Sequence, residues 1–205
     1  MIPEQTEAII FDFGGVIINI DYNFTIEAFK SLGVEDFESM YSQAQQSDLF
    51  DAIETGRISA QSFINGLLDY LPSGTSPNSV VTAWNAMILD VPSERIELLQ
   101  KLRQHYQVYL LSNTNEIHIE KALGEWTKAN SFGIESCFDS IYLSHEMGMR
   151  KPNKEIFERV CNEQNLYPSK TLFIDDSIQH IEGAKNAGLQ TIFLTDGMEI
   201  QSIFS

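Results

Sequence analysis

Apolar and polar residues alternate in two distinct patterns along this chain. In the first pattern, short unbroken apolar runs end directly in a polar residue, which is typical of strands buried on both faces. These runs occupy residues 8–11, 108–111, 141–143, 171–174 and 191–194. Between several of them, apolar residues recur at helical spacing, and we expect helices at residues 93–105, 155–166 and 178–187.

The alternation of strands and helices predicts a Rossmann-like α/β fold, a parallel sheet with helices on both faces. Ligands of such sheets bind beyond the carboxyl ends of the strands. The polar residues at those ends are Asp12, Ser112 and the pair Asp175 and Asp176. They are far apart in the sequence, and the fold predicts that they converge at one edge of the sheet.

The second pattern runs from about residue 21 to residue 90 and contains no comparable apolar run. It shows instead repeated helix-start residues, each followed by apolar residues at helical spacing. The expected starts are Asp21, Asp36, Ser47-Asp48, Ser59 and Pro77-Asn78. We therefore predict an all-helical cap at residues 19–90, inserted into a core of residues 1–18 and 91–205. A helical subdomain with no role in the chemistry is the alternative.

Composition limits the class of partner. The 205 residues include 13 Lys plus Arg and 29 Asp plus Glu, a formal charge of −16, and 43% hydrophobic residues. The apolar content excludes general disorder, and the acidity argues against nucleic acid and anionic membranes. No apolar run is long enough to span a bilayer, and the start has no secretory signal pattern, so we expect a cytoplasmic protein. Cys137 and Cys161 lack metal-binding spacing and are expected to be free thiols.

The pair of carboxylates after residues 171–174 points to a cation. Adjacent buried carboxylates repel each other, and a cation between Asp175, Asp176 and a third carboxylate relieves that repulsion. Asp12 supplies the third carboxylate, and together they form the all-oxygen donor set that Mg²⁺ prefers. Capping of the following helix by Asp176 and Ser177 is the alternative.

Other residues at the strand ends suit a phosphate group. Gly14 and Gly15 follow Asp12 and let backbone N–H groups approach an anion closely. Ser112 and Asn113 offer a hydroxyl and amides, although a simple turn explains them equally well. Lys151 can neutralise a phosphoryl oxygen, although a lysine before proline is more often a surface residue.

The order of these motifs resembles the haloacid dehalogenase (HAD) superfamily of hydrolases, in the subgroup with a helical cap between its first two motifs. The motifs are Phe11–Val16, Leu111–Thr114, Arg150–Pro152 and Phe173–Ser177. Within the superfamily, the chain most resembles bacterial α-D-glucose-1-phosphate phosphatases. That likeness also includes Gly56–Ser59, Leu143-Ser144, Met147–Pro152 and Ile181–Ala184.

The resemblance implies covalent catalysis with Mg²⁺ as cofactor and a small phosphorylated substrate as partner. Asp12 would attack phosphorus and form an aspartyl-phosphate that water hydrolyses. The protein ligands of Mg²⁺ would be Asp12, the carbonyl of Gly14 and Asp176. Asp175 would lie behind them and orient Lys151 or a water on the metal.

The resemblance also assigns substrate contacts. Ser112 and the backbone N–H of Asn113 would hold the phosphoryl group, and Lys151 would balance its charge. The loop with Gly14 and Gly15 would lie against the same group. Arg57, in the cap, would contact the body of the substrate, although an exposed surface arginine is the simpler interpretation.

The chain departs from the usual phosphatase pattern at Gly14. Most phosphatases of the superfamily carry an aspartate there, which protonates the leaving oxygen and later activates water. The glucose-1-phosphate phosphatases share the glycine, so its presence does not imply inactivity. The candidate substitutes for the missing acid are His118, His145 and His180, and His180 is the best placed because it follows Asp176 by one helical turn.

Other functions compete with this interpretation. A 2-haloacid dehalogenase has the same fold and also lacks the second aspartate, but it needs no metal, which leaves the Asp175-Asp176 pair unexplained. A phosphomutase needs the acid that Gly14 lacks. A signalling receiver domain gathers similar residues but is shorter and has no cap. A non-catalytic phosphate-binding protein is the remaining alternative. The sequence names neither the substrate nor the oligomeric state.

Overall fold

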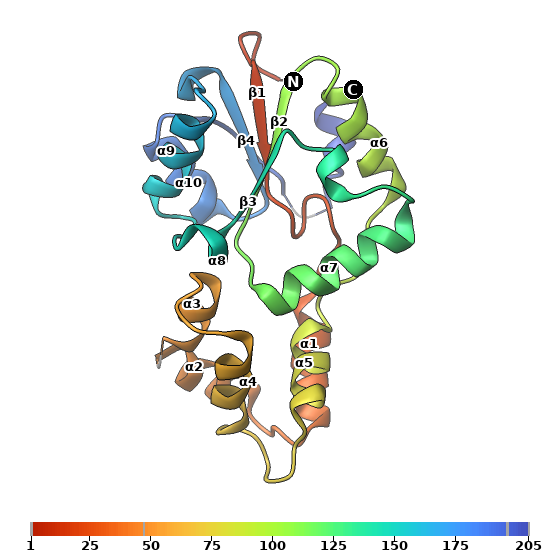
Figure 1. Ribbon diagram of the computed structural model, residues 1–205, viewed down its shortest axis with the longest axis vertical. Coiled ribbons are helices and arrows are strands. Elements are labelled where there is room, and N and C mark those ends of the chain that lie inside the picture. Colours follow the sequence, from red (N-terminus) through yellow and green to blue (C-terminus); the bar gives the residue numbers. More distant parts are fainter. Residues whose placement is uncertain (1, 47, 196, 205) are drawn as a thin grey trace.

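A five-stranded parallel sheet forms the centre of the protein (Figure 1). The computed structural model describes residues 2–46, 48–195 and 197–204. The strands are β1 (Ala8–Phe11), β2 (Gln107–Ser112), β3 (Ser140–Leu143), β4 (Thr171–Asp175) and β5 (Gln190–Phe193), in the order β3-β2-β1-β4-β5. All four neighbouring pairs are parallel, so the predicted Rossmann-like α/β fold is confirmed.

The central strands are buried because an apolar layer packs on each face of the sheet. In β1, Ile9 and Phe11 belong to one hydrophobic cluster, and Ala8 and Ile10 belong to the other. This alternation follows from the two-residue period of a strand. The prediction of burial on both faces is wrong for β5, where Phe193 is exposed, because β5 lies at the edge of the sheet.

Helices cover both faces of the sheet (Figure 1). They are α6 (Ser93–Leu102), α7 (Glu116–Ala129), α8 (Ser144–Met147), α9 (Lys154–Glu163) and α10 (Ile178–Asn186), with 3₁₀ turns at Ile134–Ser136, Pro168–Lys170 and Ile200–Ile203. Helices α6 and α7 pack on one face, and α9 and α10 pack on the other. The three predicted helices are present and end one to three residues early, whereas α7 was not predicted.

Five helices follow β1 and form what we call the helical insert. They are α1 (Tyr22–Ser31), α2 (Phe37–Gln46), α3 (Leu49–Glu54), α4 (Ala60–Leu68) and α5 (Pro77–Asn85). The predicted starts at Asp21, Asp36 and Ser59 are confirmed, because each side chain accepts a hydrogen bond from a backbone N–H of the first turn.

Two predicted helix starts need correction. Asp48 precedes α3 with left-handed backbone dihedral angles and makes no capping hydrogen bond through its side chain. Ser47, its predicted companion, lies outside the described residues. Helix α5 begins at Pro77 rather than after Asn78, and Ser76 caps it by accepting from the N–H of Ser79. Proline suits the first helical position because it lacks the N–H that would be unpaired there.

The helical insert has a hydrophobic core of its own and joins the rest of the chain through two paired linkers. The core contains Phe29, Phe63 and Trp84. Asn19 donates through its N–H to the carbonyl of Asp90 at 2.9 Å and accepts from the N–H of Leu89 at 2.9 Å. The two linkers therefore run side by side, and the insert lies beyond the carboxyl ends of the strands (Figure 1).

Two further expectations can be compared with the structure. Among the described residues, no helix combines the length and the apolarity needed to cross a bilayer. Cys137 and Cys161 are free and buried, as expected.

Candidate active site

The polar residues at the strand ends converge as predicted. Asp12 follows β1, Ser112 ends β2 and Asp175 ends β4. In the register of the sheet, Phe11 lies beside both Leu110 and Ile174. Asp12, Ser112 and Asp175 come one or two residues later and therefore lie together where the carboxyl ends of the strands meet, which we call the sheet edge. Ser112, Asp12 and Asp175 are all buried, which requires partners for their polar atoms.

Lys151 connects the ends of the strands through hydrogen bonds. Its Nζ donates to Asp12 Oδ1 at 2.7 Å, to Asp175 Oδ2 at 2.8 Å and to the carbonyl of Leu111 at 3.0 Å. The side chain is fully buried, with 0% exposure. Three acceptors match the three N–H donors of an ammonium group. This burial rules out the alternative of a surface lysine.

Asn113 and Ser144 fix the loops that carry these groups. The Asn113 side chain donates to the carbonyl of Lys151 at 2.9 Å and accepts from its N–H at 2.9 Å. The Ser144 hydroxyl accepts from the N–H of Thr114 at 2.9 Å and donates to the Thr114 carbonyl at 3.0 Å. The side chain of Asn113 therefore positions Lys151. The phosphoryl contact predicted for Asn113 uses a different group, its backbone N–H.

The pKa values of the two buried carboxylates shift in opposite directions. For Asp12, burial raises the pKa to about 7, with a further contribution from Asp175, while Lys151 opposes both. For Asp175, burial acts in the same direction, but Lys151 and His180 outweigh it and hold the pKa at about 2. Asp175 also accepts from the N–H of Ser177 at 2.7 Å and lies 3.0 Å from His180 Nδ1. Lys151 and His180 therefore favour the ionised form of Asp175.

The donor set at the edge fits a hard cation. Asp12, Asp175 and His180 each place one ligand atom within 4.8 Å of the others. Asp176 lies against the loop after β1, since a Cβ on Gly15 would come within 2.1 Å of Asp176 Oδ2. Burial, and then the charge of Asp175, raises the pKa of Asp176, and no lysine or arginine among the described residues pairs with it. A divalent ion bound by oxygen ligands would relieve this repulsion.

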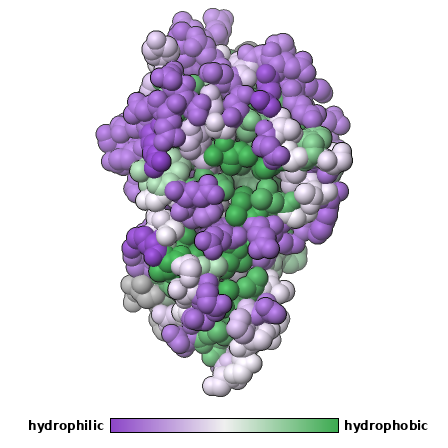
Figure 2. Space-filling model, viewed as in Figure 1, coloured by the Kyte–Doolittle hydropathy of each residue, from purple (hydrophilic) through white to green (hydrophobic). Residues whose placement is uncertain are grey.

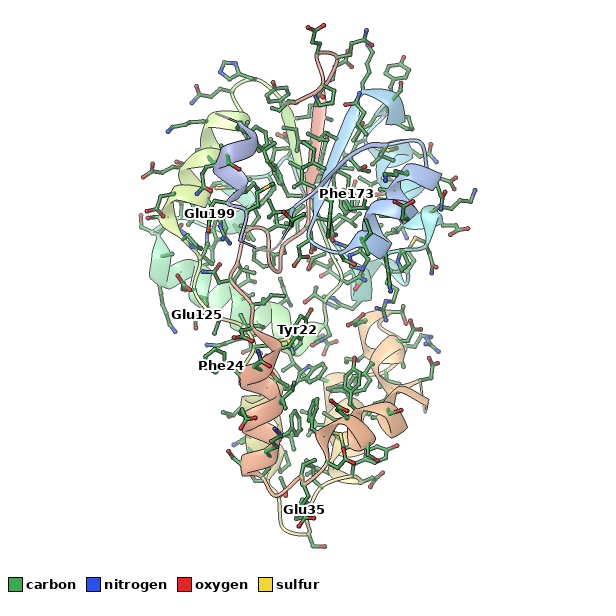
Figure 3. All side chains as sticks on the ribbon, turned by 180° about the vertical axis from the view of Figure 1, so that it is seen from behind. Tyr22, Phe24, Glu35, Glu125, Phe173 and Glu199 are labelled. Carbon is green, nitrogen blue, oxygen red and sulfur yellow. The ribbon has the colours of Figure 1, made fainter. Side chains whose placement is uncertain are left out.

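A cavity of about 500 Å³ opens from this edge toward the helical insert. Asp12, Gly14, Ser112 and Asn113 line one end of it. The insert supplies an aromatic wall of Phe37, Tyr41 and Trp84, with Tyr22 where the insert meets the core (Figure 3). Apolar surface also gathers at this junction in the space-filling view (Figure 2). The cavity is large enough for a small metabolite.

The three candidate histidines occupy different places. His180 lines the cavity beside Asp175. His118 lines it as well, but its Nε2 lies 3.2 Å from the carbonyl of Trp84 and its ring stacks on that residue at 4.7 Å. His145 lies outside the cavity, in a separate hollow. Of the three, only His180 is placed next to the carboxylates without being held by the helical insert.

Gly14 has no side chain where the usual phosphatase carries an aspartate. A Cβ at Gly14 would meet Ile20 Cδ1 at 3.3 Å, so Ile20 occupies part of the neighbouring space. The backbone of Gly14 does not adopt the left-handed conformation, unlike that of Gly15 at φ +75°. A side chain at position 14 therefore needs only a small shift of Ile20.

The structure gives no support for Arg57 as a substrate contact. Its guanidinium pairs with Asp48 and Asp51 on the exposed side of the insert, and Arg57 does not line the cavity. Arg150 and Glu54 line it instead, and sequence reasoning missed both as site residues. The signal for Arg150 was its place directly before Lys151 in the third motif.

Comparisons with known proteins agree with this geometry. Residues 6–188 match the haloacid dehalogenase-like hydrolase family. A D-ribitol-5-phosphate phosphatase of Bacteroides thetaiotaomicron is 32% identical over 191 residues, covering 93% of each chain. A HAD family enzyme of the same species, solved in complex with magnesium and inorganic phosphate, superposes with a TM-score of 0.90 at 34% identity, covering 98% of this chain and 100% of that one.

A further solved structure extends the likeness to another species. A predicted HAD-like hydrolase of Porphyromonas gingivalis has a TM-score of 0.86 and 31% identity, with coverage of 98% of this chain and 97% of that one. The family match covers the strand-end residues, the helical insert and the lysine loop. The chain belongs to the haloacid dehalogenase-like hydrolase family.

Proposed function

We propose that this hydrolase is a phosphatase that uses Mg²⁺ to cleave a small phosphorylated metabolite, a sugar or sugar-alcohol phosphate such as glucose 1-phosphate. One observation carries the proposal: the buried Lys151 ammonium joins Asp12 to Asp175 at one end of a cavity of about 500 Å³. The relative from Bacteroides thetaiotaomicron, a D-ribitol-5-phosphate phosphatase, supports this substrate class.

The residues that would hold Mg²⁺ are Asp12, Asp176 and the carbonyl of Gly14, with Asp175 behind them. The carboxylate of Asp176, which has no basic partner among the described residues, supports this assignment. When bound, the ion would offset the repulsion between the nucleophile and the phosphoryl oxygens. The magnesium and phosphate found together in the related HAD enzyme agree with this role.

Asp12 is the nucleophile in this proposal. Its carboxylate oxygen forms a bond to phosphorus while the ester P–O bond breaks and the alcohol leaves. Water then attacks the aspartyl-phosphate, releases inorganic phosphate and restores the carboxylate. Lys151 keeps the Asp12 carboxylate oriented and balances the charge of the phosphoryl group, while the Ser112 hydroxyl and the Asn113 N–H hold its oxygens.

The leaving alcohol needs a proton that Gly14 does not supply. His180 lines the cavity and contacts Asp175, so we assign it as the candidate donor. General acid–base assistance contributes roughly 10²- to 10⁴-fold to rates. Loss of this donor in a His180→Ala variant is therefore expected to slow the turnover of esters with poor leaving groups by about this factor.

We assign the helical insert the role of a cap domain of residues 19–90 over a core of residues 1–18 and 91–205. The hydrogen-bonded linkers at Asn19, Leu89 and Asp90 support a hinge at this boundary. The insert lies over the strand ends, where it would exclude water from the reacting phosphate.

A substrate panel tests the proposal. Purified protein is assayed for phosphate release from glucose 1-phosphate, ribitol 5-phosphate and p-nitrophenyl phosphate, with Mg²⁺ and with a chelator. The expected result is release that requires Mg²⁺ and favours a sugar or sugar-alcohol ester. Halide release from 2-chloropropionate without Mg²⁺ would instead identify a dehalogenase. Binding of phosphate without turnover of any ester would identify a non-catalytic binding protein.

A further inference from the structure

The cavity contains an acidic and a basic side chain at the contact between the helical insert and the core, away from the strand-end carboxylates. We infer that Glu54 and Arg150 recognise hydroxyl groups on the body of the substrate and so select polyhydroxylated phosphate esters over plain alkyl esters. This inference rests on the proposed phosphatase function and deepens it.

Glu54 and Arg150 come from different parts of the molecule and meet at the cavity. Glu54 is the last residue of α3 in the helical insert, and Arg150 directly precedes Lys151 in the core. Helix α3 faces the core at α8, close to the loop of Arg150 (Figure 1). Arg150 Nη1 lies 3.0 Å from Glu54 Oε2 and 3.4 Å from Asp51 Oδ1. Glu54 and Arg150 line the cavity, whereas Asp51 does not.

The two oxygens of Glu54 have different surroundings. Oε2 is closed off from solvent and accepts no hydrogen bond from the described residues, because the nearby guanidinium is not aligned with it. The Glu54 side chain is nevertheless 23% exposed. That exposed part excludes Oε2, and Glu54 is one of the residues that line the cavity. The carboxylate therefore has acceptor capacity that the protein itself does not use.

Arg150 supplies unused donors beside that acceptor. Its side chain is 30% exposed, and the bond to Asp51 is the one hydrogen bond it donates within the described part of the chain. A guanidinium has five N–H donors in a fixed plane. The other donors form no hydrogen bond within the described part of the chain, and Arg150 lines the cavity.

An acceptor and a donor side by side match the needs of a hydroxyl-bearing carbon chain. Each hydroxyl donates one hydrogen bond and accepts others, and bonds to charged partners are stronger than neutral ones. Burial raises the pKa of Glu54, and Arg150 opposes this shift. Burial disfavours the ionised form of the Glu54 carboxylate, and a substrate hydroxyl that donates a hydrogen bond to this carboxylate would stabilise that form.

Much of the cavity wall is apolar, although several hydroxyl-bearing side chains also line it. Phe37, Trp84 and Ile88 present apolar surface, which packs on C–H groups of hydroxylated and plain substrates alike. Apolar pockets reject an added hydroxyl only weakly, whereas a site built to bond a hydroxyl rejects an analogue that lacks it strongly. We assign the selection to the Glu54–Arg150 pair because these two charged side chains lie 3.0 Å apart and both line the cavity.

Asp51 provides the matched control, because the pair also connects the helical insert to the core. Asp51 contacts the same nitrogen of Arg150 but lies outside the cavity. If Glu54 and Arg150 acted only by holding the insert in place, neutralising Glu54 or Asp51 would change kcat/KM by the same factor for every substrate.

The test compares Glu54→Gln and Asp51→Asn with the wild type on ribitol 5-phosphate and propyl phosphate, two alkyl esters of similar leaving group. The ratio of the two kcat/KM values is measured with Mg²⁺ present, and thermal unfolding checks that each variant is folded. In Glu54→Gln the ratio is expected to fall about 10- to 100-fold, mainly through the KM of ribitol 5-phosphate, as expected for a lost bond to a charged group. In Asp51→Asn the ratio is expected to keep its wild-type value.

Two outcomes would overturn the inference. An unchanged ratio in a folded Glu54→Gln variant, or equal losses on both esters in both variants, would show that the pair only holds the insert. If the wild type released phosphate from no ester, p-nitrophenyl phosphate included, the proposed function itself would fail and the inference with it. Turnover of both esters without selectivity would overturn the inference alone.

Discussion

The sheet edge and the helical insert bury very different side chains. At the sheet edge, Lys151 and Asp175 are fully buried and hydrogen-bonded to each other at 2.8 Å, between the two apolar layers of the sheet. The insert instead buries packed aromatic rings, with the Trp84 ring stacked on Phe50 at 5.4 Å between centroids and tilted against Phe63 at 5.1 Å. Charges need fixed partners at fixed distances, whereas apolar packing accepts changes that conserve volume.

This difference suggests a division of labour. In the proposed function, the sheet edge holds the groups whose geometry the chemistry requires. The insert contributes residues to the cavity wall and would surround the body of the substrate. The Glu54–Arg150 pair joins the two regions. The predictions below separate the contributions of the two regions, beginning with the largest effect.

Removing the buried lysine tests the sheet edge. In Lys151→Met, Asp12 and Asp175 lose their shared cation, and we expect the free energy of unfolding to fall by about 3–5 kcal/mol and phosphatase activity to be lost. Lys154→Met is the control, since Lys154 pairs with Glu158 on the surface and its loss costs less than about 1 kcal/mol. Urea unfolding of both variants measures the difference. A similar loss of unfolding free energy in the two variants would mean that the buried lysine contributes no more to stability than a surface lysine does.

Acid titration tests the contact between the insert and the core. Burial lowers the pKa of His118 to about 4, although its bond to the Trp84 carbonyl opposes the shift. The unfolded chain binds a proton at this histidine below about pH 6.5, while the folded chain does not until about pH 4, so stability falls as the pH drops through this window. We expect a loss of up to about 3 kcal/mol.

The variant His118→Gln isolates this contribution from that of the many carboxylates. The difference in unfolding free energy between the wild type and His118→Gln should shrink as the pH falls from 6.5 to 4. A difference that stays constant over this range would show that His118 is not held neutral against Trp84.

Adding one methyl group to the loop after β1 is the mildest change. Gly15 and Gly197 have φ of +75° and +76°, so alanine strains both by about 1–2 kcal/mol. At Gly15 the new Cβ would also collide with Asp176, whereas nothing lies within 4 Å at Gly197. We expect Gly15→Ala alone to weaken Mg²⁺ activation, by about 10- to 100-fold. Equal Mg²⁺ dependence in the two variants would argue against Asp176 as a ligand.

The fold was predictable where local sequence determines burial. Central strands are covered on both faces, which leaves unbroken apolar runs such as Ala8–Phe11. Helix α7 was missed because its apolar residues serve two cores: Ile117 packs into the insert, while Ala122 and Trp126 pack onto the sheet. Its capping residue, Asn115, also lies in a segment that suited a phosphate-binding turn.

The site residues that directly follow strands were predictable from the sequence. Those whose position depends on how the helical insert docks against the core were not. Asp12, Ser112 and Asp175 meet because parallel strands end at one edge. Which arginine faces the cavity depends on how the insert docks against the core, and the place of Arg150 directly before Lys151 in the third motif is the one local sign that separates it from Arg57. Long-range packing decides that choice.

Replacing the carboxylate of Asp12 by an amide tests the central claim most directly. Asp12→Asn keeps the shape of the side chain, and Lys151 keeps its bonds to Asp175 and to the Leu111 carbonyl, so the variant is expected to fold. Mg²⁺-dependent phosphate release from p-nitrophenyl phosphate is measured for the variant and the wild type. The account predicts loss of release in a folded Asp12→Asn protein, and retained release would contradict Asp12 as the nucleophile.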